Sequence, residues 1–109
     1  MNDLVNEISS KTTSLDAALV QLGKRGRELA QAEHDYRVAL AEKILRERDG
    51  GMPVTIINDV CRGDRKIAKL KLERDIAQVM YDSALEAINV YKLQTRVLEN
   101  QIDREWHRS

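Results

Sequence analysis

The chain has 109 residues, with 18 Lys and Arg against 18 Asp and Glu, one cysteine, one proline, three tyrosines, one tryptophan and no phenylalanine. This length allows one domain at most, and a helix-forming composition poor in aromatic residues favours an all-α fold over a β-sandwich or barrel. The formal net charge of zero removes the argument that overall charge would give for nucleic acid or a membrane surface as a partner.

A first long helix is predicted over about residues 14–48. Short hydroxyl side chains crowd residues 9–14 and compete for backbone hydrogen bonds, whereas Ser14 before Asp16 suits a helix N-cap. We therefore expect the helix to begin near Ser14, with residues 3–9 as a separate turn or a frayed extension. Its apolar or small residues recur in steps of three and four, with Glu33 as the one charged interruption: Leu15, Leu19, Leu22, Gly26, Leu29, Tyr36, Leu40 and Ile44.

The middle of the chain, residues 49–63, is predicted to form a tip. Two glycines followed by Met52 and Pro53 stop the first helix. Pro53 suits the first position of a short helix that continues to Arg62 and closes at Gly63. An extended conformation over residues 54–57 is the alternative, because these residues are strong β formers.

A second long helix is predicted over about residues 64–107, with Asp64 as its cap. Its apolar series again advances by three and four, with Arg74 at one position: Ile67, Leu70, Ala77, Tyr81, Ala84, Ile88, Tyr91, Thr95, Leu98 and Ile102. The short connection predicts that the two helices fold back as an antiparallel, coiled-coil-like hairpin, and that residues 1–109 form a single domain. Bases at the start of the second helix would then lie beside acids at the end of the first.

The second helix carries a further apolar stripe, displaced around the helix from the first. Its members are Leu72, Ile76, Val79, Ser83, Ala87, Val90 and Val97. One partner helix does not cover both stripes, so we expect a homodimer of hairpins that forms a four-helix bundle. In the alternative, the N-terminal segment with Leu4, Val5 and Ile8 curls back over the stripe.

No catalytic, cofactor or metal site is predicted. The histidines are His34 and His107, the only cysteine is Cys61, and no spacing suggests a nucleophile with its base. Asp103 and His107 are four residues apart, but two ligands near a chain end make a weak metal site. We expect a protein that is not an enzyme, has no cofactor and takes no small-molecule substrate.

Two surfaces near the tip are candidates for binding a partner. Apolar residues stand where polar turn residues are usual, namely Met52, Val54, Ile56 and Ile57; they either contact a protein partner or plug the end of the bundle. A basic set, Arg62, Arg65, Lys66, Lys69 and Lys71, gives nucleic-acid binding as the alternative. Facing acids and the lack of a stacking aromatic residue in this segment argue against that alternative.

Localisation follows from what the sequence lacks. No window approaches the roughly 18 apolar residues of a membrane span. The first residues, MNDLVNEISS, hold acids where a signal peptide has bases. A lone cysteine agrees with a reducing compartment. We expect a cytoplasmic protein with no membrane partner.

Three segments carry a resemblance to a known class of proteins: the run GMPVTIINDVCRGD at residues 51–64, ERDIA at 73–77 and LENQIDREW at 98–106. Over roughly residues 30–106 the chain resembles small helical proteins encoded by phages and prophages of Gram-positive bacteria. The resemblance implies a phage origin and the cytoplasm of the bacterial host, and it carries no residue role. Together with the stripes it favours a rigid helical rod that binds a host or phage protein, as an accessory factor or an inhibitor.

Overall fold

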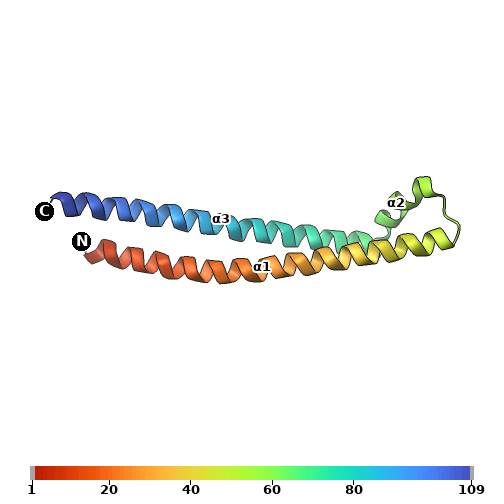
Figure 1. Cartoon of the computed structure of the whole chain (residues 1–109), viewed down its shortest axis with the longest axis horizontal. Coiled ribbons are helices and arrows are strands. Elements are labelled where there is room, and N and C mark those ends of the chain that lie inside the picture. The colour runs from red at the N-terminus through yellow and green to blue at the C-terminus, as the bar shows by residue number, and fades with distance from the viewer. Residues whose placement is uncertain (1, 109) are drawn as a thin grey trace. The chain divides into compact units, whose positions relative to one another are not determined.

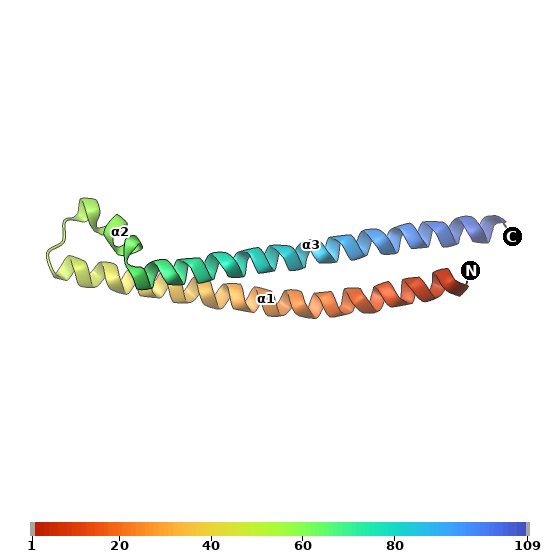
Figure 2. The same ribbon diagram turned by 180° about the vertical axis from the view of Figure 1, so that it is seen from behind.

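A computed structural model describes residues 2–108, which form three helices and, within that range, no strand. The helices are α1 (Asn2–Asp49), α2 (Val54–Gly63) and α3 (Arg65–Arg108) (Figure 1). The chain divides into two compact units, one with residues up to 25 and from 81 onward, called unit 1, and one with residues 26–80, called unit 2. In each unit a part of α1 packs antiparallel to a part of α3, so the predicted all-α hairpin is confirmed (Figure 2).

The predicted start of the first helix near Ser14 is wrong, because α1 is continuous from Asn2. The hydroxyl residues stay within the helix: Thr13 Oγ1 donates to the Ser9 carbonyl oxygen four residues earlier, at 3.1 Å. Leu4 and Ile8 are half-buried in unit 1, so tertiary packing outweighs weak local propensity. The alternative in which this segment curls back over the second stripe is also wrong, since the segment continues α1.

The loop between α1 and α2 depends on Gly51. Its φ of +92° lies in the left-handed region, where side chains other than glycine are strained. Around it, the Gly50 amide donates to the Arg46 carbonyl, the Gly51 amide to Arg48 and the Met52 amide to Glu47, at 3.0–3.1 Å. These bonds satisfy carbonyls that the end of α1 leaves without intrahelical partners.

The short helix at the tip is confirmed, and the extended alternative is wrong. Pro53 immediately precedes α2, with φ −59° and ψ 136°, and occupies the N-cap rather than the first helical position. Ile57 and Cys61 are one helical turn apart and are both buried. A strand would place them on one face too, but with residue 59, an aspartate, between them on that same face. The helix buries two apolar groups and leaves Asp59 exposed.

The predicted cap of the second long helix is also confirmed. Asp64 Oδ2 accepts hydrogen bonds from the backbone amides of Lys66 (3.1 Å) and Ile67 (3.2 Å). Its other oxygen lies 3.9 Å from Lys43 Nζ of α1. One side chain therefore starts α3 and contacts α1 in unit 2.

The apolar series on the two long helices form the contact between them. In unit 2 the buried side chains are Ile57, Cys61 and Ile67, and in unit 1 Ile88 is buried. The remaining members of the α3 series are half-buried, as are those of the α1 series with one exception. Leu19 is exposed, and Ala18 is half-buried in its place.

Within residues 2–108, none of the helices has a stretch long and apolar enough to cross a membrane.

Candidate interaction surfaces

The second stripe of α3 is uncovered in the single chain. Five of its members expose between 44% and 61% of their surface, whereas Ala87 is half-buried. The five are Leu72, Ile76, Val79, Val90 and Val97. Sequence reasoning missed Leu93, which is 59% exposed and fills the step between Val90 and Val97. Its place in the same three-and-four spacing was the signal that would have found it.

In unit 1 the stripe borders a shallow groove. Leu93, Val97 and Leu98 of α3 form its apolar wall, with Gln94 beside them, and Glu7 and Lys11 of α1 form the opposite edge. In unit 2 the stripe consists of Leu72, Ile76 and Val79. Each unit therefore presents an apolar part of the stripe to solvent.

The four apolar tip residues do not share one environment. Ile57 is 3% exposed and packs inward within the single chain. Val54 and Ile56 are exposed, and Met52 is half-buried. Val60 is also exposed, one helical turn after Ile56, and sequence reasoning did not include it. Ile56 and Val60, which share one side of α2, and Val54, which is exposed on another side of the same short helix, are together called the α2 patch.

The basic set lies at the end of α2 and the start of α3, in unit 2. All five side chains are exposed: Arg62, Arg65, Lys66, Lys69 and Lys71. Lys71 is engaged within the chain, because its Nζ contacts Asp75 Oδ1 at 2.7 Å and lies 5.8 Å from the centre of the Tyr36 ring. The Asp64 carboxylate lies at the start of α3. In the sequence it separates Arg62 of α2 from the basic residues of α3, which begin at Arg65.

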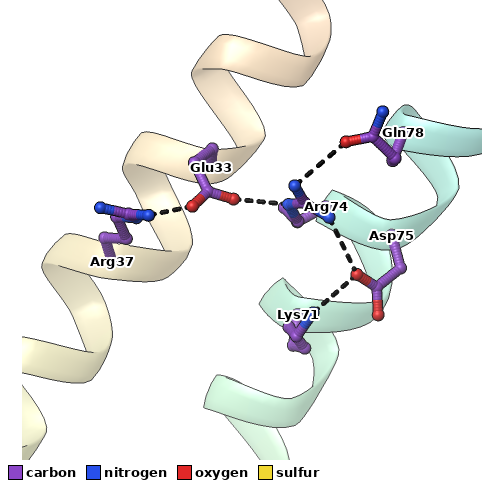
Figure 3. Close-up of polar contacts among 6 residues, drawn as sticks. All are labelled: Glu33, Arg37, Lys71, Arg74, Asp75 and Gln78. Carbon is purple, nitrogen blue, oxygen red and sulfur yellow. Dashed lines mark hydrogen bonds and ion pairs between the residues drawn. The ribbon is translucent and has the colours of Figure 1, made fainter. Parts of the chain in front are cut away.

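The two charged residues that interrupt the apolar series meet in unit 2 (Figure 3). Arg74 Nε of α3 donates to Glu33 Oε2 of α1, and the other oxygen of Glu33 accepts from Arg37 Nε at 2.6 Å. Arg74 also donates to Gln78 Oε1 at 3.1 Å and to Asp75 Oδ1 at 3.4 Å.

These contacts fix the ionisation of the carboxylates. Hydrogen bonds from Arg37 and then Arg74 lower the pKa of Glu33 below its ordinary value of 4.5. The hydrogen bond from Lys71 lowers the pKa of Asp75 below 3.8. The hydrogen bond to Glu33 in turn raises the pKa of Arg74. Because both oxygens of Glu33 are occupied and its pKa is low, the group is a poor proton acceptor and holds the two helices together.

The remaining reactive side chains are separate from these surfaces. Cys61 of α2 is a free thiol and is fully buried. His107 Nε2 lies 3.3 Å from Asp103 Oδ1, with both side chains largely exposed. Among residues 2–108 no three His, Cys, Asp or Glu side chains are grouped as metal ligands would be.

Comparison of the chain with protein-family models, with curated proteins and with solved structures found no match.

Proposed function

We propose that this chain is a non-enzymatic interaction protein that works as a homodimer and binds a host or phage protein in the bacterial cytoplasm, as an accessory factor or an inhibitor. The observation that carries the proposal is the exposed α3 stripe, a regular apolar series on a helix whose other apolar series already packs against α1. The phage origin and the cytoplasmic location come from the sequence resemblance.

The energetics favour covering the stripe. Fully burying a Val, Leu or Ile side chain contributes about 1.5–3 kcal/mol relative to leaving it in water. Leu72, Ile76 and Val79 in unit 2, with Val90 and Val97 in unit 1, are each near half-exposed, so covering them gives a substantial part of that gain for each. Exposed apolar surface of this kind, present in each unit, marks an association site more often than a free surface.

The homodimer is tested by sedimentation equilibrium of the intact chain and two variants. We expect a mass of two chains for the native protein and a mass of one chain for Val79→Lys, because a charge placed in an apolar interface is costly. Val20→Lys is the matched control: Val20 is 75% exposed on α1, outside the stripe, and its substitution is expected to leave the dimer intact. A native mass of one chain at 100 µM overturns the homodimer.

The α2 patch is the proposed contact for the protein partner. Val54 and Ile56 keep their apolar side chains in solvent although α2 already buries Ile57 and Cys61. Tagged native protein, a Val54→Ser/Ile56→Ser variant and a Val20→Ser/Val38→Ser control are used to isolate partners from host and infected cells. A specific partner is retained by the native chain and the control and lost by the α2 variant; retention by all three overturns the assignment of the patch.

Nucleic-acid binding is the alternative function, favoured by the exposure of all five members of the basic set. It predicts a complex with duplex DNA or RNA at low salt that weakens steeply as salt rises. Arg65→Gln/Lys66→Gln/Lys69→Gln would abolish the complex in a mobility-shift assay. Absence of a complex for the native chain at low salt excludes this alternative.

A further inference from the structure

We propose that the second copy of the chain covers the stripe with its own stripe, α3 against α3 in antiparallel orientation, in one defined register. In that register Val79 faces the partner's Val90, Ile76 faces the partner's Leu93, and Leu72 faces the partner's Val97. The inference rests on the homodimer proposed above and specifies its interface.

The occupant is α3 of the second copy because, among the helices of residues 2–108, α3 alone has a matching series. At about 100° per residue, the centre of the stripe lies on the order of 150° around α3 from the series that packs against α1. Most of the stripe is therefore directed away from α1, while Leu93 and Val97 also border the groove shared with Glu7 and Lys11 of α1. The exposed large apolar residues of α1 do not continue in steps of three and four: Val5, Leu19, Val20, Val38 and Leu45. The two α3 helices accordingly form the centre of the dimer, and each α1 lies outside.

The stripe follows a strict heptad pattern along α3, which is one continuous helix from Arg65 to Arg108. One set of core positions, spaced by seven, is Leu72, Val79, Glu86 and Leu93; the other is Ile76, Ser83, Val90 and Val97. In an antiparallel pair of helices each member of one set faces a member of the other set on the partner. The favoured register is the one in which apolar residues of one set face apolar residues of the other set and polar residues face polar residues.

In the proposed register every apolar member faces an apolar member, and the two polar members, Ser83 and Glu86, face each other at the two-fold axis. A shift of one heptad in one direction puts Val90 against the partner's Glu86. A shift in the other direction puts Ile76 against the partner's Glu86. Each shift buries a carboxylate against a branched apolar side chain, which is unfavourable without a partner.

A parallel pair is disfavoured at the same position. It would place Glu86 of one copy against Glu86 of the other within the apolar interface, where two like charges repel. The antiparallel pair separates the two carboxylates into different layers and gives each a Ser83 hydroxyl as a hydrogen-bond donor. The polar layer then acts as buried polar residues do in coiled coils, where they specify register and orientation.

The residues that flank the stripe agree with the same register. On one edge Asp75 lies opposite the partner's Arg96, a pair of opposite charges. On the other edge Met80, which is 39% exposed, lies opposite the partner's Ala87. At these two flanking pairs, charge and size are complementary.

The register is tested by distance measurements between spin labels on the two copies. In a Cys61→Ala background, single cysteines are introduced by Leu85→Cys, Lys92→Cys and Glu99→Cys, three positions that share a face directed away from the stripe. Pulsed electron–electron double resonance then gives one distance between the spin labels of the two copies for each variant. Circular dichroism and sedimentation equilibrium check that each labelled variant keeps the native helix content and mass.

The two-fold axis lies between residues 84 and 85. The separation between the two labels therefore increases as the labelled residue lies farther along α3 from this axis. With a rise of about 1.5 Å per residue, the two labels are offset along the helix axis by about 2 Å at residue 85, about 22 Å at 92 and about 44 Å at 99. A shift by one heptad changes the last two values by about 10 Å each. A parallel pair gives nearly equal distances at all three positions.

The expected result is the steep increase from 85 to 99 with these offsets. Equal distances, or distances displaced by a heptad in a chain that is dimeric by mass, overturn the register and leave the homodimer standing. A mass of one chain for native protein overturns both. An independent check uses Glu86→Leu/Ser83→Leu: with the polar layer removed, we expect a tighter dimer whose label distances are no longer single-valued.

Discussion

Arg74 donates to Glu33 across unit 2, so the charged residue that interrupts the apolar series of α3 is paired with the one that interrupts the series of α1. A shift of one helix against the other by a single turn would separate the two groups and leave each facing an apolar neighbour. The pair therefore favours one register of α1 on α3 in this unit. Its position within a contact of apolar side chains makes a mismatch costly, although the pair is partly open to solvent.

The contribution of Glu33 to stability is expected to depend on pH. Since its pKa in the folded chain is lowered, the ionised form stabilises the fold above the ordinary pKa of 4.5, and this stabilisation is lost as the pH falls through the lowered value. Glu33→Gln is therefore expected to lower the melting temperature at pH 7, and its difference from the native chain is expected to shrink as the pH falls from 4.5 toward 2.5. Circular dichroism melts between these pH values, at one chain concentration and salt concentration, measure the difference. Glu42→Gln, an exposed carboxylate on the same helix, is the control; an equal pH trend for both variants would contradict the assignment.

Removing the Asp64 cap is expected to destabilise the chain. Asp64→Ala leaves the amides of Lys66 and Ile67 without their acceptor, at a cost of about 0.5–2 kcal/mol in the free energy of unfolding. Asp64→Asn keeps an oxygen acceptor at the same place and is expected to lose much less. Chemical denaturation of the three proteins at one chain concentration makes the comparison, which matters because dimerisation is linked to stability. Equal losses in both variants would assign the effect to charge rather than to the cap.

The glycines on either side of α2 are expected to respond in opposite directions to alanine. Gly51→Ala places a side chain at φ +92° and is expected to cost about 1–2 kcal/mol. Gly63 has an ordinary helical conformation with open space beside it, so Gly63→Ala is expected to stabilise the chain by about 0.4–1 kcal/mol. Thermal or urea unfolding of the two variants tests this. A stabilised Gly51→Ala would show that the left-handed turn is not required.

Truncation of Ile88 is expected to be the most damaging of these substitutions. Ile88 is 2% exposed in unit 1, and Ile88→Ala removes buried methylene groups at about 2–5 kcal/mol. Val20→Ala, on exposed α1 surface, is expected to stay within about 0.5 kcal/mol of native stability. Urea unfolding followed by circular dichroism distinguishes the two. Similar losses for both would mean that Ile88 is not part of a packed core.

Features set by neighbouring residues were predictable from the sequence. The spacing of Ile67, Tyr81 and Ile88 identified the face of α3 that packs against α1. The glycine pair before Pro53 marked the end of α1, and Asp64 was recognised as a cap. Each of these depends on helical periodicity or on a side chain bonding to backbone within a few residues.

Tertiary packing determined the features that local sequence patterns did not predict or predicted wrongly. It extended α1 back to Asn2 through a segment of weak helix propensity, because Leu4 and Ile8 are packed in unit 1. It paired Glu33 with Arg74, which local spacing had shown only as two separate interruptions. Tertiary packing also buried Ile57 and left its neighbour Ile56 exposed to solvent. A helix has 3.6 residues per turn, so adjacent side chains lie on different faces. Contacts with the rest of the chain then determine which of these faces is covered.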